Sequence, residues 1–180
     1  YYTNGSTVEL DKANPHDNGF VMSPVISNVA DYIIGPADPN LTNRTFVYVL
    51  VYEYTDSDGN VTRSSPSFQY GITTGALTNA IAIDLVTPLC NIKSNISGTR
   101  FSSIVNIAIY RTLDAGSTFY KVTDSYTVFN DGSDYTILDT TSDLVLANNE
   151  ILYTTGGVLE NSPAPAARFS TSGGGRLFLA

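Results

Sequence analysis

The sequence predicts an all-β protein, built as an antiparallel β-sandwich, on three observations. Apolar and polar residues alternate with a period of two along most of the chain, which is typical of strands. Turn-forming residues separate about six or seven short runs of this kind. Apolar residues make up 42% of the 180 residues, which is enough for a packed core and excludes wholesale disorder.

The strongest predicted strand covers Thr45 to Thr55, where nearly every residue is β-branched or aromatic. Both of its faces are apolar, so we expect a central strand covered on both sides. Asp56 to Asn60 is predicted to be the turn that follows, because Asp58-Gly59 supplies the positive φ of hairpin turns. Val61 to Ser65 would return as the partner strand, and Pro66 would end its pairing.

Five further strands are predicted by the same alternation. They are Ala80 to Val86, Ile104 to Thr112, Phe119 to Val122, Ser125 to Phe129 and Tyr135 to Asp139. The second and third of these would form a hairpin around a turn at Asp114 to Ser117, and another turn is expected at Asn130 to Asp134. Ser142 to Asn149 is predicted to form one helical turn, capped by Ser142 or Asp143.

Composition divides the chain into three parts. Residues 1–40 are predicted to be irregular with one or two strands, and we assign them to the end of a preceding domain. Residues 41–158 would form the β-sandwich. Residues 159–180, rich in Gly and Pro, would form a linker and the start of a following domain. Because the chain starts at Tyr1-Tyr2 and stops at Arg176 to Ala180, which is predicted to be the opening of another strand, we expect a segment of a longer polypeptide.

Charge and rare residue types argue against several classes of function. Nine Lys and Arg stand against 17 Asp and Glu, a net charge of −8, so tight binding of nucleic acid is not expected. Cys90 and His16 are alone of their kinds, which leaves no disulfide framework and no thiolate metal cluster, and nearly excludes triad chemistry. We expect His16 to be a solvated turn residue. No apolar run reaches the roughly 20 residues of a membrane helix.

Two patterns of carboxylates could indicate a calcium site or a glycosidase site. Asp56-x-Asp58-Gly59-Asn60 resembles the start of a calcium loop, but Gly59 stands at position four and Ser67 at position twelve, so we interpret it as a turn. A glycosidase would need two of the carboxylates near turns to face each other, whereas Asp in turns is the simpler interpretation. These carboxylates are Asp131, Asp134, Asp139 and Asp143. We predict no catalytic residue, no metal and no cofactor.

Two stretches together carry a family resemblance. Tyr48 to Asp56, followed by Asp58-Gly59-Asn60 and Arg63 to Ser67, resembles the F–G hairpin of fibronectin type III-like sandwiches. Ile107 to Thr112, followed by Gly116 to Val122, resembles the C–C′ hairpin of the same superfamily. The F–G-like hairpin comes first, so either one sandwich has permuted connectivity or two half-domains are present.

The order of these motifs, closed by Leu152 to Pro165 and Gly175-Arg-Leu-Phe-Leu, is similar to large virion proteins of tailed bacteriophages, tail nozzle and hub proteins among them. In such proteins the sandwich lies beside or within a β-propeller-like body. The resemblance implies a non-enzymatic virion component that forms a ring around the DNA exit path. Its partners would be other copies of itself and neighbouring tail proteins, with passing DNA not tightly bound, no membrane span and no small-molecule substrate.

We expect partner contacts at exposed turns, because sandwich domains commonly place binding loops at hairpin tips. These candidate interaction residues are Asp56, Asp58, Gly59, Asn60, Asp114, Gly116, Asn130, Asp131 and Asp134. The alternative is a receptor- or carbohydrate-binding sandwich of a phage fibre or bacterial surface protein. A row of exposed Tyr on one sheet face would favour it, although most of the 12 Tyr and 8 Phe are expected in the core or on the sheet surface. A hydrolase has the least support, for lack of His and of a nucleophile motif.

Overall fold

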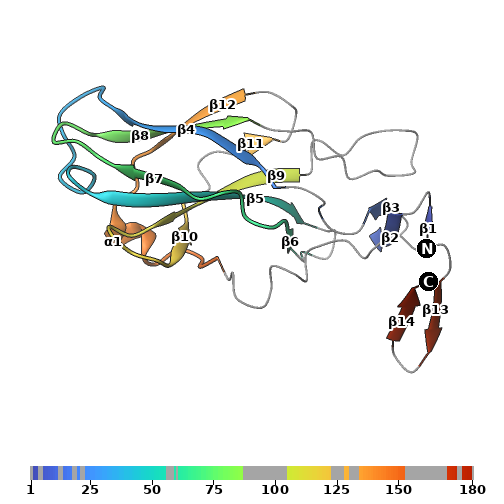
Figure 1. Cartoon of the computed structure of the whole chain (residues 1–180). Helices are drawn as coiled ribbons and strands as arrows, with labels where there is room; N and C mark the ends of the chain where they lie inside the picture. Colours follow the sequence, from blue (N-terminus) through green and yellow to red (C-terminus); the bar gives the residue numbers. More distant parts are fainter. Residues whose placement is uncertain are drawn as a thin grey trace.

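The chain forms antiparallel β-sheets in a computed structural model, which confirms the predicted all-β class (Figure 1). The structure describes residues 2–3, 6–11, 14–17, 20, 23–55, 59, 61–86, 105–122, 128–129, 134–152, 170–173 and 176–179. Within these ranges the one helix is α1 (Asp143–Leu146), a single turn.

The larger sheet has two long central strands, β5 (Thr45–Thr55) and β9 (Val105–Thr112). They pair antiparallel, from Tyr48 opposite Arg111 to Tyr54 opposite Val105. Short strands pair with the outer edge of each. These are β10 (Phe119–Lys121) and β11 (Val128–Phe129) on β9, and β6 (Val61–Arg63) and β7 (Tyr70–Thr73) on β5. The predicted central strand and both predicted hairpins are therefore confirmed.

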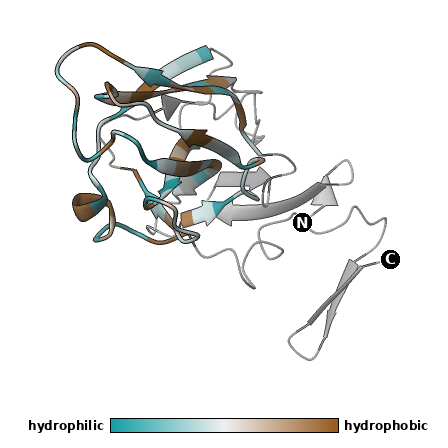
Figure 2. Cartoon of the chain, turned by 60° about the vertical axis from the view of Figure 1, so that its left-hand side comes forward, coloured by the Kyte–Doolittle hydropathy of each residue, from teal (hydrophilic) through white to brown (hydrophobic). Residues whose placement is uncertain are grey.

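The smaller sheet places β8 (Ala80–Val86) between β4 (Val25–Tyr32) and β12 (Asp134–Asp139). The two sheets enclose one apolar core, to which β5, β9, β8, β4 and β12 all contribute (Figure 1). Ile81, Ile83 and Leu85 of β8 are buried in it, as predicted. In Figure 2 the hydrophobic colour lies on parts of these strands and on α1.

Strand β5 is buried on both of its faces because a different part of the chain covers each one. Tyr48 and Leu50 belong to the core between the sheets. Val49 and Val51 point the other way and form a second cluster with Leu152 and other residues. The F–G-like and C–C′-like hairpins share this one sheet and one core, so the two motifs do not form two separate half-domains.

Two buried serines join β6 to β7 along the edge of β5. Ser64 Oγ accepts a hydrogen bond from Tyr52 N–H at 2.9 Å, and Ser67 Oγ accepts one from Leu50 N–H at 3.0 Å. Pro66, between them, has no N–H to offer a ladder. Pairing of β6 ends at Arg63, two residues before the predicted end at Ser65, and the hydroxyls then satisfy backbone groups of β5 that would otherwise be buried without partners.

The positions of two strands of the sheets were not predicted, although one or two strands were expected within residues 1–40. The sheets begin before the predicted boundary at residue 41, because β4 pairs with β8 along its length. Its alternation is broken by a bulge between Ile26 and Asn28, which hid the period of two. Strand β7 has only four residues, with Gly71 inside it, and glycine has low strand propensity.

Strands outside the two sheets correct one expectation and confirm another. β1 (Tyr2–Thr3), β2 (Ser6–Asp11) and β3 (Asn14–Asp17) form a three-stranded sheet, in which His16 lies opposite Glu9. His16 is therefore a strand residue rather than a turn residue. β13 (Ser170–Gly173) and β14 (Arg176–Leu179) form a hairpin, which confirms the strand expected at the end of the sequence.

Candidate functional site

Four connecting segments meet at one end of the two sheets, which we call the loop end: residues 33–44, 74–79, 113–118 and 140–149 (Figure 1, left). Backbone hydrogen bonds join the first two segments, and the carboxylates of Asp114 and Asp143 link the other two to them. Asp38 N–H donates to Thr78 O, and Asn43 N–H donates to Gly75 O. The loop end is thus one continuous surface, built from segments far apart in sequence.

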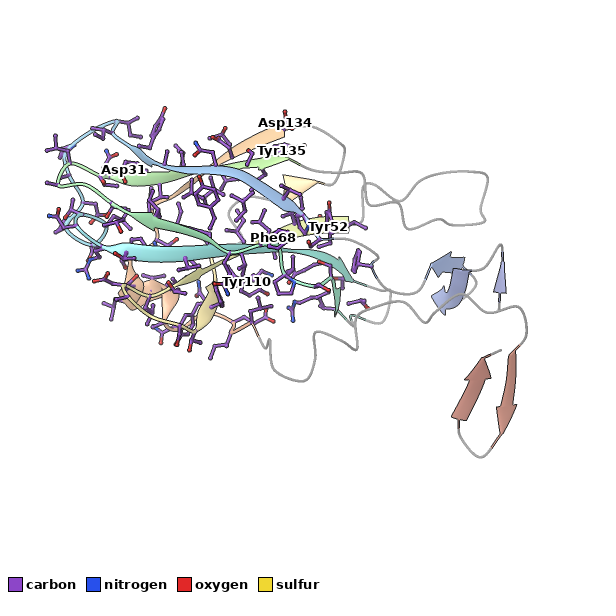
Figure 3. All side chains as sticks on the ribbon, in the orientation of Figure 1. Asp31, Tyr52, Phe68, Tyr110, Asp134 and Tyr135 are labelled. Atoms are coloured by element: carbon purple, nitrogen blue, oxygen red, sulfur yellow. The ribbon has the colours of Figure 1, made fainter. Side chains whose placement is uncertain are left out.

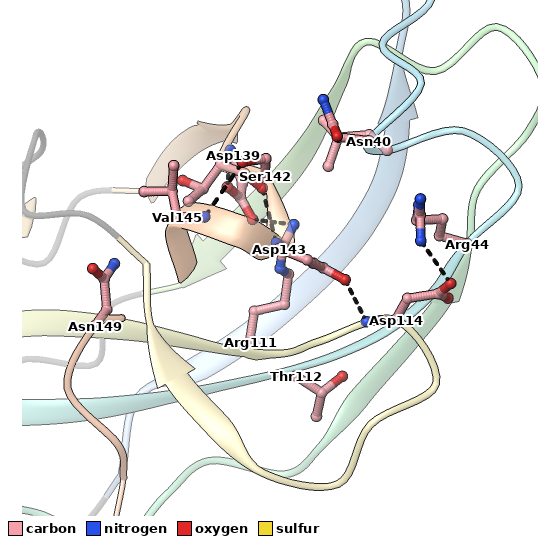
Figure 4. A network of polar contacts seen from close by, with 12 residues as sticks. Asn40, Arg44, Arg111, Thr112, Asp114, Asp139, Ser142, Asp143, Val145 and Asn149 are labelled. Carbon is pink, nitrogen blue, oxygen red and sulfur yellow. Dashed lines mark hydrogen bonds and ion pairs between the residues drawn. The ribbon is translucent and has the colours of Figure 1, made fainter. Parts of the chain in front are cut away.

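The centre of the loop end is a buried arginine. Arg111, near the end of β9, has a fully buried side chain, and its Nη1 lies 3.1 Å from Oδ2 of the equally buried Asp139. Its Nη2 donates to Thr141 O at 2.8 Å and to Asp143 Oδ1 at 3.0 Å (Figure 4). The guanidinium carbon lies 4.3 Å from the centre of the Phe46 ring, within cation–π range. Because Arg111 and Asp139 belong to different sheets, their ion pair links the two sheets.

Asp139 receives further donors. Tyr48 OH donates to its Oδ2 at 2.8 Å, and Thr141 N–H donates to its Oδ1 at 2.8 Å. Burial, together with the negative charge of Asp139, raises the pKa of Tyr48 well above its ordinary value, so the phenol keeps its proton and remains a donor. The contact between Arg111 Nη1 and Asp139 lacks hydrogen-bond geometry and is electrostatic. These donors and the facing guanidinium supply the partners that a buried carboxylate requires.

The polar network continues through the turn after β9. Asp143 Oδ2 accepts from Asp114 N–H at 2.8 Å, and Asp114 Oδ1 accepts from Thr45 N–H at 2.9 Å. The second oxygen of Asp114 lies 2.9 Å from Arg44 Nη1 (Figure 4). Both oxygens of this predicted interaction residue are therefore engaged within the chain, and they hold the turn against the start of β5.

The turn and the helix of the loop end confirm local predictions. Gly116 N–H donates to Leu113 O at 2.9 Å, and the positive φ of the turn, 51°, falls on Ala115. Ser142, and not Asp143, is the N-cap of α1, with its side chain accepting from Val145 N–H.

The other predicted interaction turns lie elsewhere. Asp56, Asp58, Asn60, Asn130 and Asp131 fall outside the described residues, and the calcium-loop interpretation with them. Gly59 has φ of 87°, as its turn required. Strand β5 ends, and β12 begins, at the end of the sheets opposite the loop end, where Figure 3 shows Asp134. The predicted residues that the structure describes therefore do not form one site.

The last predicted turn does not lie at a hairpin tip. Strands β11 and β12, which flank Asn130 to Asp134, belong to different sheets. β11 and β12 are therefore not the two strands of one hairpin. The same turn-forming residues are found in hairpin turns and in connections between strands that do not pair, so the sequence could not distinguish the two.

A second charge cluster lies on the outer face of the larger sheet. Glu53 Oε1 accepts from Arg63 Nε at 2.7 Å and from Tyr110 OH at 3.2 Å, and Glu53 Oε2 accepts from Lys121 Nζ at 3.0 Å. Arg63 also pairs with Glu150. Burial raises the pKa of Glu53, but the hydrogen bonds from Arg63 and Lys121 outweigh it and hold that pKa below its ordinary value. Burial also raises the pKa of Tyr110, with the Glu53 charge adding to it.

Arg111 and Glu53 were missed by the sequence analysis, although a signal was present. Both alternate with large apolar residues in strands that are otherwise apolar, in positions where a charge must be buried. A buried charge requires a partner, so each predicts an ion pair, but the identity of that partner depends on the fold. Among the described residues no three His, Cys, Asp or Glu are placed to hold a metal ion.

The tyrosine side chains that the structure describes on the two central strands do not form an exposed row. Tyr48, Tyr52 and Tyr110 are all fully buried, in agreement with the core interpretation.

Over the residues that the structure describes, no helix has the length and apolar character to cross a membrane. No protein-family model, curated protein or solved structure matches the chain.

Proposed function

We propose that this chain is a non-enzymatic structural component of a bacteriophage tail, of the nozzle or hub type. It would assemble with other copies of itself and with neighbouring tail proteins into a ring around the DNA exit path. The tail assignment rests on the motif order described above, with the two sheets forming a fibronectin type III-like sandwich of permuted connectivity. The structural role rests on the Arg111–Asp139 ion pair and its network.

That network supports a structural role because it uses the charged side chains to hold the fold. Asp139 accepts from Tyr48 and Thr141 while facing Arg111, and Asp114 accepts from Thr45 and Arg44. A catalytic carboxylate needs an oxygen facing its substrate. Carboxylates engaged in this way instead fix both sheets and the loops of one end in a single geometry, which suits a subunit of a rigid assembly.

The charge of the chain supports passage of DNA without binding. The net charge is −8, and each cation whose side chain the structure describes lies in an ion pair: Arg44, Arg63, Arg111 and Lys121. Phosphates would meet repulsion within a Debye length of about 8 Å at physiological salt. We expect no binding of a fluorescent DNA duplex at about 50 mM salt, and tight binding there would contradict the proposal.

The direct test is the native particle. Intact-protein mass spectrometry would give the length of the native chain, and electron microscopy of the source particle would give its position and copy number. We expect a longer chain in a ring at a phage tail. A native chain ending near residue 180 and present as a free monomer would reject the tail proposal. Specific binding on a glycan array would then favour the receptor- or carbohydrate-binding alternative.

A further inference from the structure

Four large apolar side chains are exposed on segments of the loop end that hydrogen bonds join, and we call these four residues the tip patch. Tyr32 is 40% exposed, Ile33 59%, Ile34 65% and Leu77 64%. They come from the end of β4 and from the two loops that lead into β5 and β8. Single exposed apolar residues need no explanation, whereas several gathered on joined loops are typical of an interaction surface.

The backbone under the tip patch is held in place. Ile34 N–H donates to Asn79 Oδ1 at 3.1 Å, and Asn79 N–H donates to Tyr32 O at 3.3 Å, so the two loops are joined directly below the exposed side chains. Gly75 N–H donates to Asp31 Oδ2 at 2.8 Å. A surface already ordered in this way loses little conformational entropy when a partner binds.

The charge beside the tip patch is negative and is not balanced by a described cation. Asp31 accepts from the neutral Gly75 N–H, and Asp38 accepts from the backbone and side-chain nitrogens of Asn40. The described cations are all paired with other carboxylates. A partner that placed Lys or Arg beside the patch would therefore gain electrostatic complementarity.

We propose that the tip patch docks a neighbouring protein whose own apolar side chains are flanked by Lys and Arg. A second copy is disfavoured as the occupant because it would bring the same carboxylates and the same net charge of −8. The inference rests on the proposed assembly role only in taking the partner to be a protein of that assembly. It adds the chemistry of the partner and the side of the molecule that receives it.

Two synthetic peptides would serve as probes, with the same Leu- and Phe-containing core and either Lys or Glu on both flanks. We expect the Lys-flanked peptide to bind the chain at least about tenfold more tightly at low salt, and to lose affinity as salt rises. The double variant Ile34→Ser with Leu77→Ser should lower that affinity by about tenfold or more. Its matched control is Leu144→Ser, which alters an 82% exposed leucine on α1, outside the patch.

Several outcomes would overturn the docking proposal: equal affinity for the two peptides, binding of neither, or an equal loss of affinity in the Leu144→Ser control. Self-association of the wild-type chain that the double variant abolishes would also overturn it, by making a second copy the occupant. These results are separable from the proposed function. A particle without a tail ring would reject the tail role while leaving selective peptide binding intact, and the reverse result would reject only the docking surface.

Discussion

Two charge clusters on opposite faces of the β5–β9 pair use the same kinds of side chain in different surroundings. The inner cluster pairs Arg111 with Asp139 between the sheets, where both side chains are 0% exposed. The outer cluster pairs Glu53, 11% exposed, with Arg63 at 24% and Lys121 at 20%. Water can replace a lost partner in the outer cluster but not in the inner one. The value of an ion pair for the fold therefore depends on access to solvent more than on the chemical groups it joins.

The largest effect is expected from breaking the inner cluster. Arg111→Met leaves Asp139 buried without its countercharge, and the free energy of unfolding should fall by about 3–5 kcal/mol. Urea denaturation monitored by circular dichroism would measure this loss. The control is Arg63→Met, which removes the corresponding arginine of the outer cluster and should cost clearly less. Equal losses in the two variants would mean that burial does not distinguish the clusters.

A matched pair of tyrosines sharpens the comparison. Tyr48 donates its hydroxyl to Asp139 in the inner cluster, and Tyr110 donates to Glu53 in the outer one. Tyr48→Phe should cost about 1–3 kcal/mol, because it removes one donor from a carboxylate that water does not reach. Tyr110→Phe should cost less, because Glu53 keeps Arg63 and Lys121. Thermal unfolding of both variants would rank them, and a larger loss for Tyr110→Phe would reverse the expected order.

The charge of Glu53 in the outer cluster should make the stability of the fold depend on pH in the acidic range. The pKa of Glu53 is lower in the folded chain than its ordinary value of 4.5. Its ionised form therefore stabilises the fold above the unfolded-state pKa, and this contribution is lost as pH falls through the folded-state pKa. Urea midpoints of wild type and Glu53→Gln should differ at neutral pH and converge in acid. A difference that stays constant from neutral pH into acid would show that Glu53 acts by shape rather than by charge.

The smallest effect is expected at the rim of the outer cluster. Glu150 is 45% exposed and pairs with an arginine that already contacts Glu53. Glu150→Gln should change the free energy of unfolding by less than about 0.5 kcal/mol, since exposed pairs contribute little. The same denaturation experiment, repeated at high salt, would check it. A loss comparable with that of Glu53→Gln would mean that the whole outer cluster acts as one unit.

Elements with strong local signals could be predicted well. The β5–β6 and β9–β10 hairpins follow from period-two alternation and turn chemistry, and the start of α1 follows from the hydroxyl of Ser142. The positions of β4 and β7 were not predicted, because a bulge in β4 and an internal glycine in β7 weaken the same signal. The candidate site was less predictable: Asp114, expected to meet a partner, instead holds the loop end together.

The sequence by itself determined the all-β class, the central strand and the two hairpins, because period two and turn residues act between near neighbours in the chain. Only the tertiary structure decided that β11 and β12 lie in different sheets, that Arg111 meets Asp139, and that the exposed Ile34 and Leu77 lie on loops joined through Asn79. The physical reason is that each of these facts is a contact between segments distant in sequence. Such contacts are selected by packing and by the need to satisfy buried charges over the whole fold, so local propensity does not predict them.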